Sequence, residues 1–232
     1  MNHEIKCEFC HNIYDLAELR NHSGVFRDRD HAGLVLTEML KDYEDSDALV
    51  LAIPAGGVPV AVPLARELNL DLDVAVVSKI TLPWNTEIGY GALAFDGTVK
   101  LNNDLVSQMG LTLEEIEEDV NQTTKKVQKR FKNFRGEKPF PDLRSRPTIL
   151  VDDGVASGFT MLVAIEALKN KGAGSIIIAV PTAHLNALEK ISSEVDSIYC
   201  ANIRGGWGFA VADAYQIWYD VEEEVVMAIL NP

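Results

Sequence analysis

The sequence predicts an α/β protein whose doubly wound, mainly parallel sheet of five strands carries a flap hairpin and a small C-terminal hood. Short apolar runs alternate with segments of helical period, a pattern typical of parallel strands covered by helices on both faces. Glycines punctuate alternating stretches over residues 80–101, which predicts the flap. Residues 203–220 are rich in glycine and aromatic side chains, and we expect them to form the hood.

The first βαβ unit follows from residues 48–54, which predict a buried strand because they are apolar on both faces. A crossover helix is expected at 58–68, and the next strand at 74–79. Ahead of this unit, acidic residues from Asp28 onward precede apolar residues at helical spacing and predict a helix.

The second half of the chain continues the alternation. Thr112 and Glu115 have the spacing of a capping box, which opens the longest predicted helix, ending near Gly136. The remaining elements are strands at 148–151, 175–180 and 197–200, helices at 160–171 and 184–192, and a last helix near 221–230.

Length and composition limit the class of protein. The 232 residues, 47% of them hydrophobic, suffice for one sizeable core, which we assign to residues 25–232. Residues 1–24 are polar and are expected to form an N-terminal arm. The excess of 35 Asp and Glu over 21 Lys and Arg disfavours nucleic acid and anionic membranes as partners. No apolar run approaches the roughly 20 residues that span a bilayer, and no apolar leader is present, so we expect a cytoplasmic protein.

The arm contains candidate metal ligands. Cys7 and Cys10, together with His3 and His11, offer four N or S donors, and a tetrahedral zinc site is one interpretation. The second half of a structural zinc site is missing, however. Cys7 to His11 also matches the haem attachment pattern, but that chemistry requires export. An arm without a ligand is the third interpretation. The three cysteines of the chain are too few for a disulfide framework.

Residues 149–161 hold the most informative motif: an apolar strand, then Asp152 and Asp153, then a small-residue turn that opens a helix. A turn of this kind presents free N–H groups and the positive end of the helix dipole, which suit a phosphate. The two carboxylates repel an anion, but they can accept hydrogen bonds from sugar hydroxyls or hold a hard cation. A phosphorylated sugar with Mg²⁺ satisfies both halves. The alternative is that the acids only cap the turn.

Two further positions point to an anion. Gly56 and Gly57 follow the strand at 48–54, where they let the backbone approach a ligand closely. They could also form a plain tight turn, in which one of them adopts a backbone conformation closed to other residues. Lys79 ends a predicted strand and could neutralise a phosphate, or it could be an ordinary solvated lysine.

The motif at residues 149–161 resembles the signature of the type I phosphoribosyltransferases: strand, two acids, small residues, Thr or Ser, Gly, a variable residue and Thr. With residues 26–29, 54–61 and 79–92, the chain is similar to a subgroup of predicted phosphoribosyltransferases over nearly everything after Val25. The resemblance implies catalytic roles for Lys79, Asp152 and Asp153, with both aspartates serving the ribose hydroxyls and Mg²⁺. It implies that pyrophosphate lies on Ala55, Gly56 and Gly57, and that the 5-phosphate lies on Ala156, Ser157, Gly158, Phe159 and Thr160.

The activity implied by the resemblance is Mg²⁺-dependent transfer of phosphoribosyl from 5-phosphoribosyl-1-pyrophosphate to a nitrogen acceptor. A nucleobase other than a 6-oxopurine is expected, because enzymes for 6-oxopurines carry Asp where this chain has Ala156. We also expect a homodimer. The alternative is a non-catalytic sensor that binds the same sugar diphosphate or a nucleotide. A Rossmann dinucleotide enzyme is disfavoured because the Gly56–Gly57 turn breaks the G-x-G-x-x-G spacing. Aromatics such as Trp207 and Trp218 in the hood either stack on a base or form a satellite core.

Overall fold

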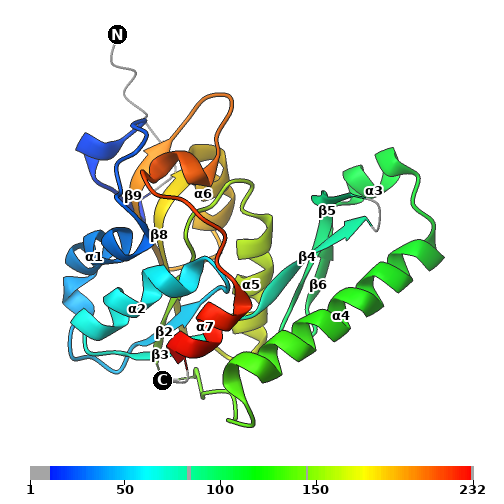
Figure 1. Cartoon of the computed structure of the whole chain (residues 1–232), viewed down its shortest axis with the longest axis horizontal. Coiled ribbons are helices and arrows are strands. Elements are labelled where there is room, and N and C mark those ends of the chain that lie inside the picture. Colours follow the sequence, from blue (N-terminus) through cyan, green and yellow to red (C-terminus); the bar gives the residue numbers. More distant parts are fainter. Residues whose placement is uncertain (1–10, 83–84, 145, 231–232) are drawn as a thin grey trace.

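A computed structural model of the chain describes residues 11–82, 85–144 and 146–230, without the side chains of residues 85–88. Within these ranges, six parallel strands form the central sheet in the order β1-β9-β8-β7-β2-β3. The α/β class with a mainly parallel sheet is therefore confirmed (Figure 1). The six strands are β1 (Ile13–Tyr14), β2 (Leu49–Ala52), β3 (Asp71–Val74), β7 (Pro147–Val151), β8 (Ser175–His184) and β9 (Ser197–Arg204).

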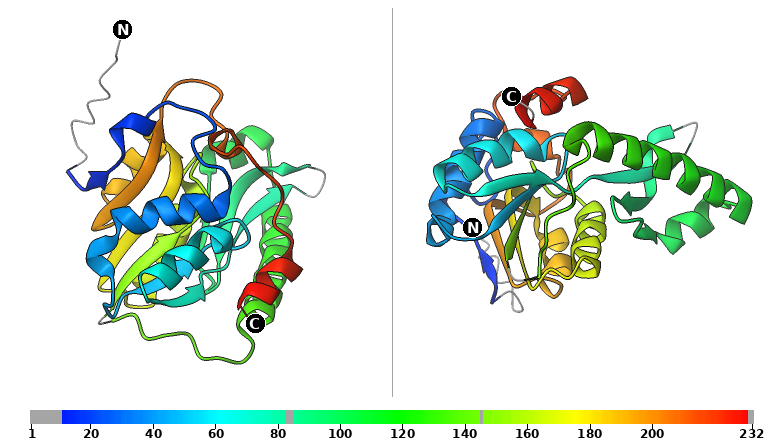
Figure 2. Two further views of the ribbon diagram at one scale, coloured as in Figure 1. Left: turned by 60° about the vertical axis from the view of Figure 1, so that its left-hand side comes forward. Right: turned by 90° about the horizontal axis from the view of Figure 1, so that it is seen from below.

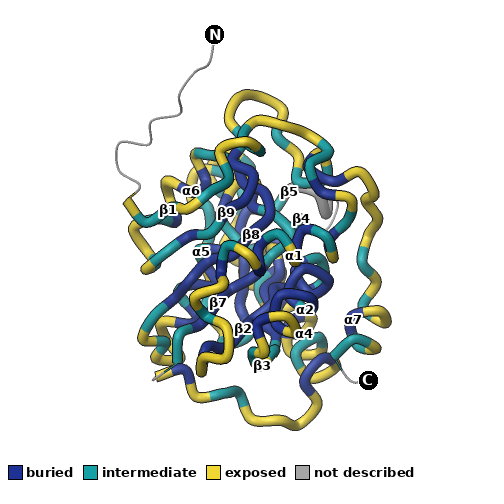
Figure 3. The backbone as a smooth tube through the Cα atoms, turned by 90° about the vertical axis from the view of Figure 1, so that its left-hand side faces the viewer, coloured by how far each residue is buried: buried dark blue, intermediate teal, exposed yellow. Residues whose placement is uncertain are grey.

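The strands are apolar throughout because helices cover both faces of the sheet. Alternate residues of β2 show this: Val50 and Ala52 join one core, whereas Leu49 and Leu51 join the other. Figure 3 shows β2, β7 and β8 as a buried centre, with the exposed residues in the surrounding turns. The first core is covered by α1 (Arg29–Met39), α2 (Gly57–Glu67) and α7 (Glu223–Leu230), and the second by α5 (Phe159–Asn170) and α6 (Leu185–Ser192).

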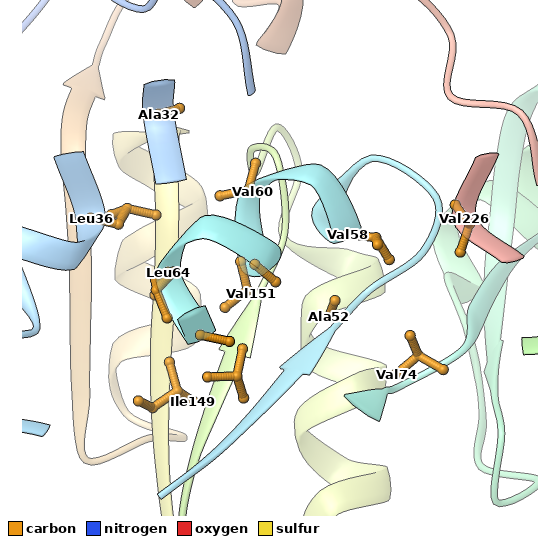
Figure 4. Packing of buried hydrophobic residues seen from close by; sticks show 14 of the residues in the cluster. Ala32, Leu36, Ala52, Val58, Val60, Leu64, Val74, Ile149, Val151 and Val226 are labelled. Atoms are coloured by element: carbon orange, nitrogen blue, oxygen red, sulfur yellow. The ribbon is translucent and has the colours of Figure 1, made fainter. Parts of the chain in front are cut away.

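Helix α2 is the main lid of the first core. Figure 4 shows Val58, Val60 and Leu64 of α2 in one cluster with Ile149 and Val151 of β7. Its neighbour α1 lies so close that a Cβ atom at Gly33 would stand 2.3 Å from the carbonyl oxygen of Val60. Glycine at position 33 therefore sets the distance between the two helices.

Replacing Gly33 by Ala should lower the free energy of unfolding by about 2 kcal/mol, because the new methyl group meets backbone that cannot rotate away. Chemical denaturation measures this change. Gly205→Ala is the matched control, since a Cβ atom there would have only the Asn21 side chain at 4.0 Å. Equal stabilities of the two variants would contradict the close approach of α1 and α2.

An antiparallel unit projects from the side of the central sheet. It consists of β4 (Val77–Leu82), β5 (Asn85–Ala94) and β6 (Val99–Leu101), followed by α3 (Asn103–Met109) and α4 (Leu113–Arg135). Figures 1 and 2 show this unit standing clear of the sheet, with the long α4 along one side. The Thr112 and Glu115 capping box is present at the start of α4, as predicted. The flap predicted at 80–101 corresponds to this sheet, which starts earlier, at Val77, and has a third strand.

The structure corrects two details of the predicted sheet. The expected strand at 74–79 is two strands, because β3 ends at Val74 in the central sheet and β4 starts at Val77 in the projection. The sheet has six strands instead of five because Ile13 and Tyr14 pair with Ile198 and Tyr199 of β9. Part of the expected arm thus lies against the sheet, whereas the division of the chain at residue 24 stays a prediction. In the described ranges, no helix has the length and hydropathy to cross a bilayer.

The hood returns from β9 over the first core. A short 3-10 turn, Val211–Ala214, leads into a stretch in which Gln216 and Ile217 donate backbone hydrogen bonds to Phe26 and Arg27. The chain then ends in α7, which packs against α4 (Figure 1). The C-terminal segment thereby connects the body of the protein to the projecting unit.

Candidate active site

A cavity of about 500 Å³ lies where β2 and β7 end, between these strand ends and the projecting unit. Carboxyl ends of neighbouring parallel strands are where α/β sheets usually bind ligands. Its lining combines carboxylates, cations and a glycine-containing turn. The lining residues are Ile53, Pro54, Val77, Ser78, Lys79, Thr81, Lys126, Arg130, Asp152, Asp153, Gly154, Val155, Ala156, Ser157, Gly158, Thr160, Met161 and Val211.

Most of the predicted site residues meet in this cavity, namely Lys79, Asp152, Asp153, Ala156, Ser157, Gly158 and Thr160. Among the described residues, four predicted contacts are not part of the lining. Phe159 packs against the second core, and Ala55 packs against the first. Gly56 and Gly57 lie behind the carboxylates instead of facing the cavity.

The two glycines are small because the ends of β2 and β7 nearly touch. A Cβ atom at Gly56 would stand 2.0 Å from Oδ2 of Asp153, and one at Gly57 would stand 2.7 Å from the carbonyl oxygen of Val151. Gly56 has a φ of −63°, and Gly57 is likewise outside the left-handed region. The expectation that one of them holds a conformation closed to other residues is therefore wrong, and space is the reason for glycine here.

The turn after β7 is fixed at both ends. The amide of Val155 donates to the carbonyl of Thr182, and the amide of His184 donates to the carbonyl of Val155, so the turn is tied to β8. At the other end, Gly158 adopts a φ of +79° as the N-cap of α5. Glycine has no side chain to cap the helix, so the first N–H groups of α5 stay available beside the cavity for an anion.

The carboxylates of Asp152 and Asp153 are unequal. Burial, together with the neighbouring charge of Asp153, holds the pKa of Asp152 well above its usual range. Burial also raises the pKa of Asp153, but the guanidinium of Arg29 opposes that rise. Oδ1 of Asp152 accepts a hydrogen bond of 2.9 Å from the Asp153 amide. Asp152 is therefore the carboxylate that gains most from a cation or a hydroxyl donor.

This asymmetry predicts how stability depends on pH. A carboxyl group whose pKa is raised by folding binds its proton more tightly in the folded state, so stability falls as pH rises from about 3.9 through the folded pKa. Asn does not titrate. Relative to its value at pH 4, the stability difference between Asp152→Asn and wild type should therefore grow by about 1 kcal/mol or more at pH 8, in favour of the variant. Denaturation in Mg²⁺-free buffer measures this difference. A constant difference across the pH range, as expected for the exposed control Asp47→Asn, would contradict the assignment.

Arg29 is a site residue that sequence reasoning missed. Its side chain is only 4% exposed, and its Nη2 lies 2.8 Å from Oδ2 of Asp153. Nη1 donates to the carbonyl of Tyr219 at 2.9 Å, and the guanidinium carbon lies 3.8 Å from the ring centroid of Trp218. The hydroxyl of Tyr215 donates to the carbonyl of Asp153 at 2.6 Å. Aromatics of the hood thus enclose the cation that holds Asp153.

Two cations from α4 were also missed. Lys126 and Arg130 line the cavity across from the turn, beside Lys79 of β4. Arg130 is 12% exposed, its Nε lies 2.7 Å from a carboxylate oxygen of Glu223, and its Nη2 lies 3.4 Å from the carbonyl oxygen of Pro54. No motif surrounds these residues in the sequence. Only the periodicity of the long helix indicated that one face of it meets the sheet.

The donors in the cavity fit Mg²⁺ and no larger metal cluster. In the part of the chain that the structure describes, no group of three or more His, Cys, Asp or Glu residues could hold a metal. Mg²⁺, however, is commonly bound by one or two carboxylates together with substrate phosphates and water. Asp152 and the Oδ1 atom of Asp153 could supply those carboxylates. The predicted zinc ligands Cys7 and Cys10 lie outside the described residues.

Comparison with known proteins is consistent with this arrangement. Residues 30–214 match the sequence model of the phosphoribosyl transferase domain. The chain belongs to the phosphoribosyltransferase family. This match covers both strand ends of the cavity, the projecting unit and the turn that opens α5. The resemblance noted in the sequence is thereby confirmed.

Relatives of this phosphoribosyltransferase-family chain include two Mycobacterium tuberculosis proteins named "Putative phosphoribosyl transferase". Each is 30% identical over 207 residues, which is 89% of this chain and 46% of the relative. The chain thus spans about half the length of these relatives. Among solved structures, the Thermus thermophilus protein TT1426 is 32% identical, with a TM-score of 0.70 over 88% of this chain and 97% of that one.

Proposed function

We propose that the protein is a Mg²⁺-dependent phosphoribosyltransferase that uses 5-phosphoribosyl-1-pyrophosphate and a nitrogen acceptor. One observation carries the proposal: a single cavity unites the helix-opening turn, the paired carboxylates and three cations. These parts correspond to the phosphate, the ribose hydroxyls and the pyrophosphate of the ligand. Family membership supports the reaction class.

In this reaction, the lone pair of the acceptor nitrogen forms a bond to C1 of the ribose. The bond between C1 and the pyrophosphate oxygen breaks, and the oxygen leaves with the electron pair. The amides around Gly158 and the hydroxyl of Thr160 would hold the 5-phosphate, while Asp152 and Asp153 would accept hydrogen bonds from the ribose hydroxyls. Lys79 would lie next to the leaving group. Mg²⁺ would screen the charges of the pyrophosphate. The protein thus acts by positioning and charge stabilisation.

The acceptor is proposed to be a nucleobase other than a 6-oxopurine. Ala156 lines the cavity where enzymes for 6-oxopurines carry a carboxylate, so this chain offers no acid at that position. We further propose a cytoplasmic homodimer that does not bind nucleic acid, in line with the net charge of −14.

The experiment that separates an enzyme from a sensor is a turnover assay. Wild-type protein is incubated with the sugar diphosphate, Mg²⁺ and a panel of nucleobases, and released pyrophosphate is measured. The Lys79→Ala variant controls for a contaminating activity, because it should release pyrophosphate far more slowly. Tight binding of the sugar diphosphate without pyrophosphate release from any base would favour the sensor.

A further inference from the structure

The basic side of the cavity consists of Lys79, Lys126 and Arg130, and two of these cations come from α4. Lys126 and Arg130 are four residues apart, which places both side chains on one face of the helix. The chain has a net charge of −14, so three cations around one cavity run against its composition. Such a concentration of positive charge indicates a binding site for a strong anion.

The two α4 cations differ in how they are held. Arg130 is fixed between Glu223 on α7 and the carbonyl of Pro54, which belongs to the turn after β2. Lys126 is exposed, and in the described part of the chain no carboxylate lies within ion-pair distance of its ammonium group. One cation is thus pre-oriented and the other is free to meet an arriving anion.

This side of the cavity is separate from the turn that opens α5. Residues 156–160 belong to the loop after β7, whereas the three cations belong to β4 and α4. A ligand that occupied both regions would carry two anionic groups, with hydroxyls between them facing Asp152 and Asp153. If the first anionic group rests on the amides of the turn, the second reaches the cations.

We propose that Lys126 and Arg130 bind the pyrophosphate of the sugar diphosphate and stabilise the negative charge that develops when its bond to C1 breaks. The inference rests on the proposed function and assigns a further part of that site. Arg130 suits a diphosphate because its planar guanidinium can donate two parallel hydrogen bonds. Its contact with Pro54 places this group next to the glycine turn, and Lys126 adds a second positive charge one helical turn away.

Titration calorimetry with two ligands tests this assignment. 5-Phosphoribosyl-1-pyrophosphate contains the pyrophosphate, whereas ribose 5-phosphate lacks it and keeps the rest. With Mg²⁺ present, Lys126→Ala and Arg130→Gln should each lower the affinity for the sugar diphosphate by about 10-fold or more, as expected for a charge-assisted contact. The affinity of both variants for ribose 5-phosphate should stay within about twofold of wild type.

Two control variants separate a direct contact with the pyrophosphate from a general loss of positive charge on α4 and from a loss of the Arg130 ion pair. Lys129→Ala deletes an exposed lysine of the same helix that is not among the cavity residues, so it should bind both ligands normally. Glu223→Gln breaks the ion pair of Arg130 but keeps the guanidinium, and it should bind the sugar diphosphate better than Arg130→Gln does.

The assignment is overturned if both ligands lose affinity equally, or if Lys126→Ala behaves like Lys129→Ala and Arg130→Gln behaves like Glu223→Gln. A wild-type protein that binds ribose 5-phosphate but not the sugar diphosphate would also overturn it, while leaving the phosphate site in place. Failure of wild type to bind either ligand would instead contradict the proposed function, and this inference with it.

Discussion

Asp152→Asn is expected to lower the affinity for 5-phosphoribosyl-1-pyrophosphate by about 100-fold in the presence of Mg²⁺, with no loss of folding. The variant keeps the side-chain oxygen that accepts the Asp153 amide but loses the charge that a cation or a ribose hydroxyl would meet. Calorimetry at pH 8 measures the affinity, and denaturation checks the fold. Asp47→Asn, on the exposed surface, should bind normally.

The combination of results matters more than either one alone. Greater stability at pH 8 together with lost binding would identify Asp152 as a carboxylate kept for its ligand at a cost in stability. Unchanged affinity in Asp152→Asn would remove Asp152 from the binding site, whatever the stability measurement showed.

Arg29→Met should destabilise the protein by about 3–5 kcal/mol, because it leaves the Asp153 carboxylate buried without its cation. Met retains much of the apolar contact with Trp218, so most of this loss reflects charge. Without Arg29, the pKa of Asp153 rises further, and a group with a raised folded pKa loses stability as pH increases through that value. The deficit should therefore be smallest near pH 4 and should increase toward pH 8.

Arg27→Met is the matched control for Arg29. Arg27 lies close to Arg29 in the chain and forms an ion pair with Asp28, but its side chain is 62% exposed. Exposed ion pairs contribute little to stability, so this variant should unfold like wild type. Similar denaturation curves for Arg27→Met and Arg29→Met would contradict the role assigned to the buried pair.

The centre of the site could be predicted from sequence because its parts are contiguous in the chain. Residues 149–161 contain the strand end, both carboxylates and the turn, so local pattern alone placed Asp152, Asp153 and Gly158 together. The same holds for the capping box of α4, which depends on a spacing of three residues. Where one segment supplied the whole feature, the prediction succeeded.

The remaining site residues depend on tertiary contacts. Arg29 lies 124 positions from Asp153, and its alternation with Asp28 and Asp30 looks like a solvated, charged helix start. Arg130 reaches the cavity only because β4 turns away from the central sheet and carries α4 with it. That departure has no signal in the sequence, since residues 74–77 are apolar without a break. The two-residue β1 is likewise too short for any periodic pattern.

The order of the central sheet also restricts how copies of this protein could meet. In the described part of the chain, the outermost strands are β1, of two residues, and β3, of four. The sequence of β3 is Asp-Leu-Asp-Val, and both acids pair with arginines, Asp71 with Arg146 and Asp73 with Arg135. Short, charged margins offer little backbone for another strand to join. Self-association by sheet extension, which leads toward aggregation, is thereby discouraged, and helical surfaces or the projecting unit are left as the places where two copies could recognise each other.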